Sequence, residues 1–249
     1  MAKKKRFNKL NKLFKVSKQK RKSLILTFFL IAAVFIFCTY GFLTRINQNT
    51  HTSPKLGKNE SVATLYFINK IGEDARSISQ ENDLYASVMI AQAVLESRYG
   101  TSKLASEPNY NLFGIKGDYQ GNSATFQTWE DDGKGHTYTI DAQFRKYPSY
   151  TESLEDYADI LSKNIYSKAR KSKADSYKEA TQALTGLYAT DTDYNTKLNQ
   201  LIKLYHLADY DRPLDPYKPG LIYNIYRHRY TSVNMLENDN LWAKQQIEN

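Results

Sequence analysis

The sequence has little of what disulfide scaffolds and metal sites need. Cys38 is the single cysteine among 249 residues, so no disulfide can form within the chain. The four histidines have no metal-ligand spacing and no His-Glu-x-x-His motif, which argues against a metalloenzyme. These histidines are His51, His136, His206 and His228. We therefore expect neither a metal ion nor another cofactor.

Two stretches near the N-terminus lack charged residues of one or both signs. The first has no acidic residue, and the second has no charged residue at all. Residues 1–22 contain eleven lysines and arginines and no acidic residue. These eleven groups exceed the net charge of the whole chain, +9, by two, so the rest of the chain carries −2. Residues 23–43 contain no charged residue over 21 positions. At about 1.5 Å of rise per residue, a helix of that length crosses the roughly 30 Å hydrocarbon core of a membrane.

These two stretches together predict a membrane anchor, with residues 1–22 as a cytoplasmic tail and Ser23–Leu43 as a transmembrane helix. Lysine runs also bind nucleic acid, but a tail next to a span favours anionic lipid headgroups, and we expect no nucleic acid partner. A membrane protein partner would meet the chain at this span. The alternative is a cleaved signal peptide, although the apolar run exceeds the usual length of about 7–15 residues.

Two apolar stripes predict the first helices of a folded domain. Residues 44–60 are polar and non-periodic, which is typical of a linker. The stripes that follow consist of Val62, Leu65, Ile68 and Ile71, and then of Leu84, Val88, Ala91 and Leu95. Steps of three and four residues indicate helices seated on a core, and Gly100 is expected to end the second one.

Glu96 is the candidate acid at the end of this second helix. It lies on the row of Tyr85, Met89 and Gln92 that borders the apolar stripe, so we expect it to be half-buried. Partial desolvation raises the pKa of a carboxylic acid, which lets it keep a proton to donate, as a general acid must. The alternative is a helix-end glutamate paired with a cation such as Arg98.

Residues 122–147 predict a β-hairpin. They are rich in Thr, Tyr and Phe, and Asp132-Gly133-Lys134-Gly135 forms a plausible turn. In an unbroken strand Glu130 shares a face with Phe126 and Thr128, while Trp129 points to the other face. From its local sequence alone, Glu130 is a solvated acid near a turn.

The remaining pattern predicts three more helices and an extension. The helices are expected at residues 150–166, where Ser149 begins a capping box, at 177–187 and at 194–205. Prolines at every third position, Pro213, Pro216 and Pro219, favour an extended spacer, so the domain is expected to end at Asp211. Residues 212–249 have enough apolar residues to dock on a surface but few for a core, and their role is unknown.

Four segments taken in order resemble the endo-β-N-acetylglucosaminidases of glycoside hydrolase family 73, which are bacterial cell-wall hydrolases, or autolysins. The segments are residues 91–100, 109–117 with Asn-Leu-Phe-Gly-Ile-Lys-Gly, 144–149 and 187–191. The resemblance covers about residues 61–211. It implies an α+β, mainly α fold, in which a lysozyme-like helical domain carries a small β-hairpin lobe, here preceded by one transmembrane helix.

The resemblance also implies an activity, which is hydrolysis of the β-1,4 bond between GlcNAc and MurNAc in peptidoglycan. Glu96 matches the general acid, and Glu130 or the substrate's acetamido group is the second participant. Tyr188 matches a tyrosine that lies by the cleft in the family. The other substrate-binding candidates are Tyr99, Tyr110 and Trp129, whose rings can stack on sugar faces, together with Asn111, Phe113 and Tyr194, although an aromatic residue in a small domain is more often part of the core. Packing is an equal alternative for Tyr188. Relatives commonly have proline where Thr192 stands, so the loop departs from the family pattern there.

Two other functions stay open from the sequence, a lytic transglycosylase and a non-catalytic scaffold for wall assembly. The expected order is a tail (1–22), a transmembrane helix (23–43), a linker (44–60), the catalytic domain (61–211) and the extension (212–249). This order predicts a single-pass protein of the cell membrane, with its N-terminus in the cytoplasm and its catalytic domain outside.

Overall fold

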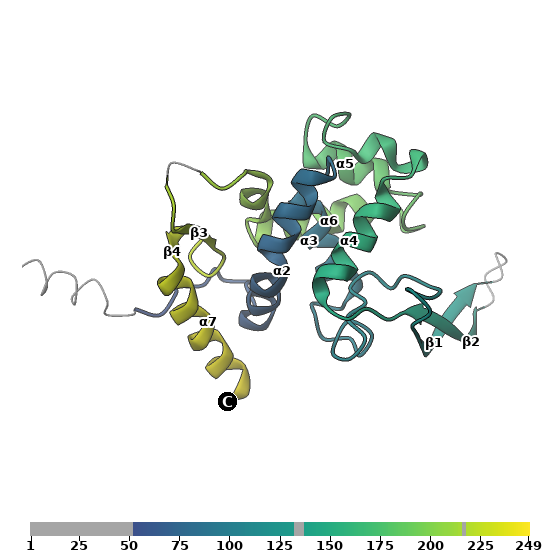
Figure 1. Ribbon diagram of the computed structural model, residues 1–249, viewed down its shortest axis with the longest axis horizontal. Coiled ribbons are helices and arrows are strands. Elements are labelled where there is room, and N and C mark those ends of the chain that lie inside the picture. The colour runs from purple at the N-terminus through teal and green to yellow at the C-terminus, as the bar shows by residue number, and fades with distance from the viewer. Residues whose placement is uncertain (1–51, 132–136, 216–217) are drawn as a thin grey trace, which may run out of the picture. The chain divides into compact units, whose positions relative to one another are not determined.

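The computed structural model describes residues 52–131, 137–215 and 218–249, with the backbone alone for residues 129–131 and 137. Residues 53–249 form one compact unit of helices with two small antiparallel sheets (Figure 1). The predicted, mainly helical fold with a small β-hairpin lobe is confirmed. The predicted span at Ser23–Leu43 lies outside the described residues, and none of the helices within them has the length and apolarity that a membrane crossing requires.

Helix α2 (Val62–Glu81) and helix α3 (Ala86–Glu96) lie at the centre of the core. Ser61 begins α2, because its hydroxyl accepts a hydrogen bond from the Thr64 N–H at 3.4 Å. The predicted stripe of α2 is buried at Leu65, Ile68 and Ile71, each 0% exposed. Both of the first two predicted helices are therefore confirmed.

Helix α3 is buried more completely than its sequence indicates. Every residue from Ala86 to Val94 is buried, and Met89 and Gln92, expected in a half-buried row, are 1% and 0% exposed. For these two residues the expectation was wrong, because α3 is covered on several sides, by α2, α6 (Tyr194–Leu204) and the short 3₁₀ helix η2 (Leu207–Asp211). Tyr85 and Glu96 of the same row are half-buried, as expected.

Three more helices follow in the chain. They are α4 (Tyr150–Leu161), the 3₁₀ helix η1 (Asn164–Ala169) and α5 (Tyr177–Leu184). Of these, α5 packs on α3, α4 packs on α2, and η1 packs on α4 and α5. Ser149 begins α4 as predicted, with its hydroxyl accepting the Thr151 N–H at 3.0 Å. The helix expected to reach residue 166 ends at Leu161, because the backbone at Lys163 is extended before η1 begins.

The predicted hairpin consists of β1 (Ser123–Asp131) and β2 (Thr137–Arg145). The strands pair antiparallel along their whole length, from Ser123 opposite Arg145 to Asp131 opposite Thr137. The base of the hairpin is tied to α4, because Asp156 binds the Arg145 guanidinium at 2.5 Å and accepts a hydrogen bond from the Tyr147 hydroxyl at 2.6 Å. The predicted turn at residues 132–135 lies outside the described residues.

The C-terminal segment folds onto the same compact unit. It forms β3 (Leu221–Asn224), β4 (Arg229–Ser232) and α7 (Val233–Glu248). Tyr223 and Tyr226 are 1% and 0% exposed, and Asn240 of α7 accepts a hydrogen bond from Asn69 of α2 at 3.0 Å. The segment buries more than the surface docking expected from its sequence, because its tyrosine rings supply much of the apolar area.

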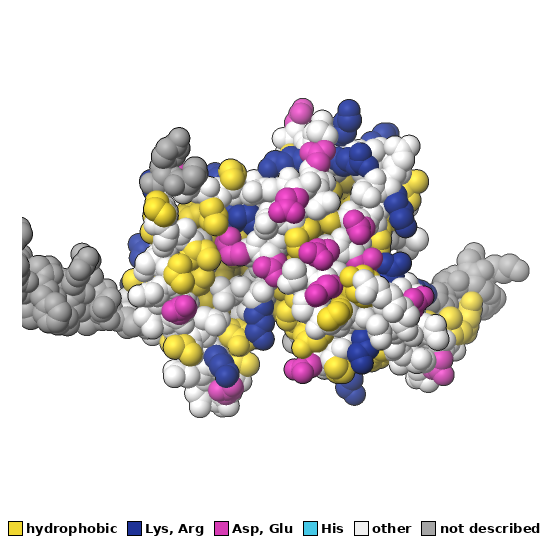
Figure 2. Space-filling model, viewed as in Figure 1, with side chains coloured by type: hydrophobic (Ala, Val, Ile, Leu, Met, Phe, Trp, Pro, Cys, Tyr) yellow, Lys and Arg dark blue, Asp and Glu magenta, His cyan; other side chains and the backbone are white. Residues whose placement is uncertain are grey.

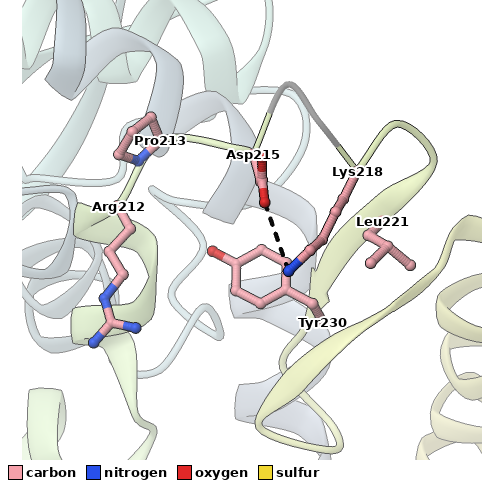
Figure 3. Close-up of a pocket in the computed structure, with 6 residues that line it drawn as sticks. All are labelled: Arg212, Pro213, Asp215, Lys218, Leu221 and Tyr230. Carbon is pink, nitrogen blue, oxygen red and sulfur yellow. Dashed lines mark ion pairs between the residues drawn. The ribbon is translucent and has the colours of Figure 1, made fainter.

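A pocket of about 240 Å³ lies between the segment that follows η2 and the β3–β4 hairpin (Figure 3). An ion pair of 3.7 Å between Asp215 and Lys218 lies at one side, and the Tyr230 ring forms part of its wall. The pocket has no lining residue in common with the site around Glu96 that is described next.

Candidate active site

Glu96 is the last residue of α3, at a point where the chain turns sharply. Arg98, Tyr99 and Gly100 all have positive φ, at 53°, 61° and 79°. A Cβ at Gly100 would come within 2.4 Å of the Phe67 ring, so both the backbone angle and the space there require glycine. The turn ends the helix directly after Glu96 and leaves the carboxyl at its C-terminal end.

The environment of Glu96 favours the protonated carboxyl. Burial raises the pKa of Glu96 above its ordinary value, and a hydrogen bond from the Tyr194 hydroxyl, at 2.8 Å, lowers it in part. The partial negative charge at the C-terminus of a helix also disfavours a carboxylate. This combination suits a group that must donate a proton near neutral pH.

Three tyrosines from different parts of the chain surround this carboxyl. Tyr188 stacks on Tyr194, with ring centroids 6.1 Å apart and planes at 17°, and meets the edge of Tyr157 at 6.1 Å. Burial and the charge of Glu96 raise the pKa of Tyr188, so its hydroxyl stays protonated. The structure thus brings the predicted residues Glu96, Tyr188 and Tyr194 together.

Gln92 and Tyr157 belong to the same cluster, although no role was expected for them from the sequence. The Gln92 amide donates a hydrogen bond to the Tyr194 oxygen at 2.9 Å and accepts one from the Tyr157 hydroxyl. The available signal was the four-residue spacing of Gln92 and Glu96, which puts them on one face of α3. Tyr157 could not be found this way, since its sequence pattern assigns it to the apolar stripe of α4.

Asn111 and Phe113, expected at the substrate, are 1% and 4% exposed. The Asn111 side chain accepts the Ile115 N–H at 3.0 Å and donates to the carbonyls of Ile115 and Arg145 at 2.9 and 2.8 Å. Phe113 stacks on Tyr157 with ring centroids 4.1 Å apart. In the structure both residues support the hairpin and the tyrosine cluster from inside the protein.

Tyr99 and Tyr110 lie at the surface or near it. Tyr99 is 47% exposed and lines a groove of about 390 Å³ between the end of α3 and α6, together with Lys197 and Gln200. Tyr110 is half-buried and meets the Tyr150 ring edge-on at 5.1 Å. Of the two, Tyr99 is the more exposed, so its ring is the one that solvent and a sugar can reach.

Glu130 and Trp129 lie on β1, where the structure describes their backbone but not their side chains. Glu130 is opposite Tyr138, and Trp129 is opposite Thr139. Tyr138 and Ile140, which lie opposite Glu130 and Thr128 in the backbone register, are 49% and 39% exposed, so these side chains of β2 are open to solvent.

The described residues contain no group of three or more His, Cys, Asp and Glu side chains that could hold a metal ion. His206 and His228 lie with ring centroids 4.3 Å apart, and His228 Nε2 lies 2.6 Å from a carboxyl oxygen of Glu60. Burial lowers the pKa of His228, which favours its neutral form. On the face in view, Figure 2 shows acidic and basic side chains interspersed, with hydrophobic side chains between them.

Comparison with known proteins adds a family match to this geometry. The family model described as "Glucosaminidase: Mannosyl-glycoprotein endo-beta-N-acetylglucosaminidase" matches residues 72–207. The chain is 36% identical over 201 residues to the exo-glucosaminidase LytG of Bacillus subtilis, which covers 78% of this chain and 68% of LytG. It is 45% identical over 151 residues to a probable N-acetylmuramidase of Lactococcus lactis, which covers 58% of this chain and 34% of that protein.

A solved structure shares the fold. The catalytic domain of the autolysin Auto from Listeria monocytogenes matches with a TM-score of 0.57 and 48% identity, over 63% of this chain and 91% of that domain. The chain spans about a third or less of the first curated relatives, with matches that cover 29%, 21% and 34% of their lengths.

Proposed function

The chain belongs to the glucosaminidase family, and from this membership we propose that it is a glycoside hydrolase that cuts the glycan strands of peptidoglycan. The bond that we propose is the β-1,4 linkage between GlcNAc and MurNAc, within the strand. The resemblance that the sequence shows to glycoside hydrolase family 73 is confirmed by the family match. Relatives named as an exo-glucosaminidase, a probable N-acetylmuramidase and an autolysin support a substrate in the cell wall.

The state of Glu96 is the observation that carries this proposal. Glycoside cleavage needs an acid that protonates the departing oxygen. Glu96 gives its proton to the glycosidic oxygen, the bond from the sugar C1 to that oxygen breaks, and the electron pair stays with the oxygen. Burial raises the pKa of Glu96, which favours the protonated form that can donate this proton.

The positive charge left at C1 needs a second participant, and three routes provide one. Glu130 activates a water in an inverting reaction, or attacks C1 itself in a retaining one; the two require carboxyl groups about 6.5–9.5 Å or about 5–5.5 Å apart. In the third route the acetamido oxygen of the substrate attacks, with Tyr188 beside it. We propose the first route, because the resemblance to the family includes Glu130 itself while the Tyr188 loop departs from the family pattern at Thr192.

Product analysis is expected to show new reducing GlcNAc ends on strand fragments longer than one sugar. Purified peptidoglycan is digested with the purified protein, and the soluble products are reduced with borohydride and identified by mass spectrometry. Reduction converts a reducing GlcNAc end to its alditol, which marks the bond that was cut.

Each alternative activity gives a different product in the same experiment. Reducing MurNAc ends would assign the activity of an N-acetylmuramidase, and anhydro ends that resist reduction would assign a lytic transglycosylase. Single GlcNAc residues without longer fragments would assign an exo enzyme. A folded protein that releases nothing would contradict the hydrolase proposal and favour a scaffold.

We also propose that the protein is held at the membrane by Ser23–Leu43, with residues 1–22 inside and the enzyme outside. The support is the uncharged run of 21 residues after eleven basic groups. The basic tail then contacts anionic headgroups of the inner leaflet, and a membrane protein partner would contact the span.

Protease added to protoplasts is expected to remove residues 61–249 and to leave a short membrane-bound N-terminal fragment. Antibodies against tags at the two ends follow each part, and a cytoplasmic enzyme that stays intact serves as the control. Protection of the C-terminal tag until the membrane is permeabilised would reverse the proposed topology.

A further inference from the structure

A chain of three hydrogen bonds crosses the protein interior and ends on Glu96. The Tyr157 hydroxyl of α4 donates to Gln92 Oε1 of α3. Gln92 Nε2 donates to the Tyr194 oxygen of α6 at 2.9 Å, and the Tyr194 hydroxyl donates to Glu96 Oε1 at 2.8 Å. Tyr157, Gln92 and Tyr194 are 1%, 0% and 2% exposed, so water does not compete for these bonds.

The chemistry of the amide gives this chain a direction. An amide oxygen only accepts hydrogen bonds, and an amide NH₂ group only donates them. Because the Gln92 oxygen faces Tyr157, that hydroxyl must donate, and burial raises the pKa of Tyr157 so that it keeps its proton. Because the Gln92 nitrogen faces Tyr194, the Tyr194 oxygen accepts there, and its own proton is left for Glu96.

We propose that Tyr157, Gln92 and Tyr194 form a positioning relay, which holds Tyr194 as a donor to Glu96 Oε1 and so confines the transferable proton of Glu96 to Oε2. The proposal rests on the proposed function, since it concerns the group that protonates the glycosidic oxygen. Among the described residues, Oε1 accepts a hydrogen bond and Oε2 has no such partner. Oε2 is therefore the oxygen that can carry a proton and present it to substrate.

The relay acts by keeping Tyr194 from serving as an acceptor for Glu96. If the Gln92 donor is lost, the Tyr194 oxygen becomes free to accept a hydrogen bond from the protonated Glu96 carboxyl. The acid proton is then held on the oxygen that faces Tyr194, away from the substrate. Such a bond also stabilises the neutral acid and raises the pKa of Glu96 further.

The titratable groups around Glu96 must be identified before a shift in the pH profile can be assigned to Glu96 itself. Tyr194 of α6, Tyr157 of α4 and Tyr188 of the loop before α6 each interact electrostatically with Glu96. Burial raises the pKa of all three hydroxyls, so they stay neutral where Glu96 titrates. A change in the pH at which Glu96 loses its proton then reports the hydrogen bond to it.

Gln92→Met in the full-length protein is the main test, because methionine keeps the length and volume of glutamine but neither donates nor accepts as an amide does. A general acid works while protonated, so activity falls as pH rises through its pKa. In Gln92→Met, the alkaline limb of the plot of kcat/KM for peptidoglycan against pH is expected to move to higher pH by about half to one pH unit. At low pH, kcat is expected to fall about 2- to 10-fold while KM stays constant.

Ser87→Ala is the matched control, since Ser87 is also a buried polar residue of α3 and its hydroxyl donates to Asp211 at 2.7 Å. It should lower stability and leave the alkaline limb in place. Tyr157→Phe should move the limb in the same direction as Gln92→Met, because an amide without that donor is free to flip. Tyr157→Phe also serves as the second variant if Gln92→Met does not fold.

Double variants test whether the residues act through one another. Gln92→Met added to Tyr194→Phe should move the alkaline limb no further than Tyr194→Phe alone, because Gln92 reaches Glu96 only through Tyr194. Full additivity, or an unmoved limb in folded Gln92→Met, would overturn the relay.

A readout that needs no activity separates this proposal from the proposed function. The carboxyl carbon of Glu96 in ¹³C-glutamate-labelled protein, assigned by its loss in Glu96→Gln, reports its pKa directly by NMR. An inactive wild-type protein would refute the hydrolase, while an upward shift of this pKa in Gln92→Met would still support the relay. An unshifted pKa would overturn the relay even in an active enzyme.

Discussion

Glu96→Gln is expected to lower kcat/KM on peptidoglycan by at least about 10²- to 10⁴-fold, the usual contribution of general acid catalysis. Glutamine keeps the shape of glutamate, and its amide oxygen can still accept the hydrogen bond from Tyr194. It has no acidic proton for the departing oxygen. The loss is measured as release of new reducing ends from purified peptidoglycan over time.

The matched control for this variant is Glu237→Gln, which removes one carboxylate from the exposed surface of α7. It should digest peptidoglycan at the wild-type rate. Circular dichroism must show that Glu96→Gln is folded, since Glu96 lies just after the buried part of α3. A folded Glu96→Gln protein with nearly full activity would remove Glu96 from the reaction.

Glu130→Gln is expected to lose most turnover, by about 10²-fold or more, if Glu130 activates water. A neutral amide cannot take the proton that the attacking water must give up. If the acetamido oxygen of the substrate attacks instead, Glu130→Gln should be milder and Tyr188→Phe comparably costly. The two variants are compared as kcat on the same peptidoglycan.

Asp131→Asn is the control for Glu130→Gln, because it removes the neighbouring carboxylate of β1 and should leave turnover unchanged. Added azide gives a second measurement, because this small anion can take the place of a missing carboxylate and attack C1 to form a glycosyl azide. Its anomeric configuration reports the face attacked. A Glu130→Gln protein with full activity on polymeric peptidoglycan would leave Glu130 as an acid of the hairpin and nothing more.

The elements of the fold could be predicted where the signal is local. The hairpin follows from Thr-, Tyr- and Phe-rich residues on both sides of a turn sequence with two glycines, and α2 follows from its regular apolar stripe. The complete burial of α3 could not be predicted, because the cover over Met89 and Gln92 comes from α6 and η2, about a hundred residues later in the chain. The spacing of apolar residues within a helix identifies one buried face. It does not identify distant segments of the chain that pack on the other faces.

The residues of the candidate site also differ in whether the local sequence could predict them. Glu96 could be found from its place at the end of an apolar helix and from the motif around it. The relay could not, because its hydrogen bonds join residues 65 and 102 positions apart, and nothing in the local sequence at Tyr157 distinguishes a donor from a core ring. Asn111 shows the reverse case, since a polar residue in a family motif turns out to hold the base of the hairpin.

The role of Glu96 as the acid is tested most directly by changing the leaving group. A phenol of low pKa departs without protonation, so an aryl glycoside of a peptidoglycan oligosaccharide needs no general acid. Wild-type protein and Glu96→Gln are compared on this substrate and on the natural glycan. We expect Glu96→Gln to keep most of its rate on the aryl glycoside while losing about 10²-fold or more on the glycan. An equal loss on both substrates would contradict the assignment of Glu96 as the general acid.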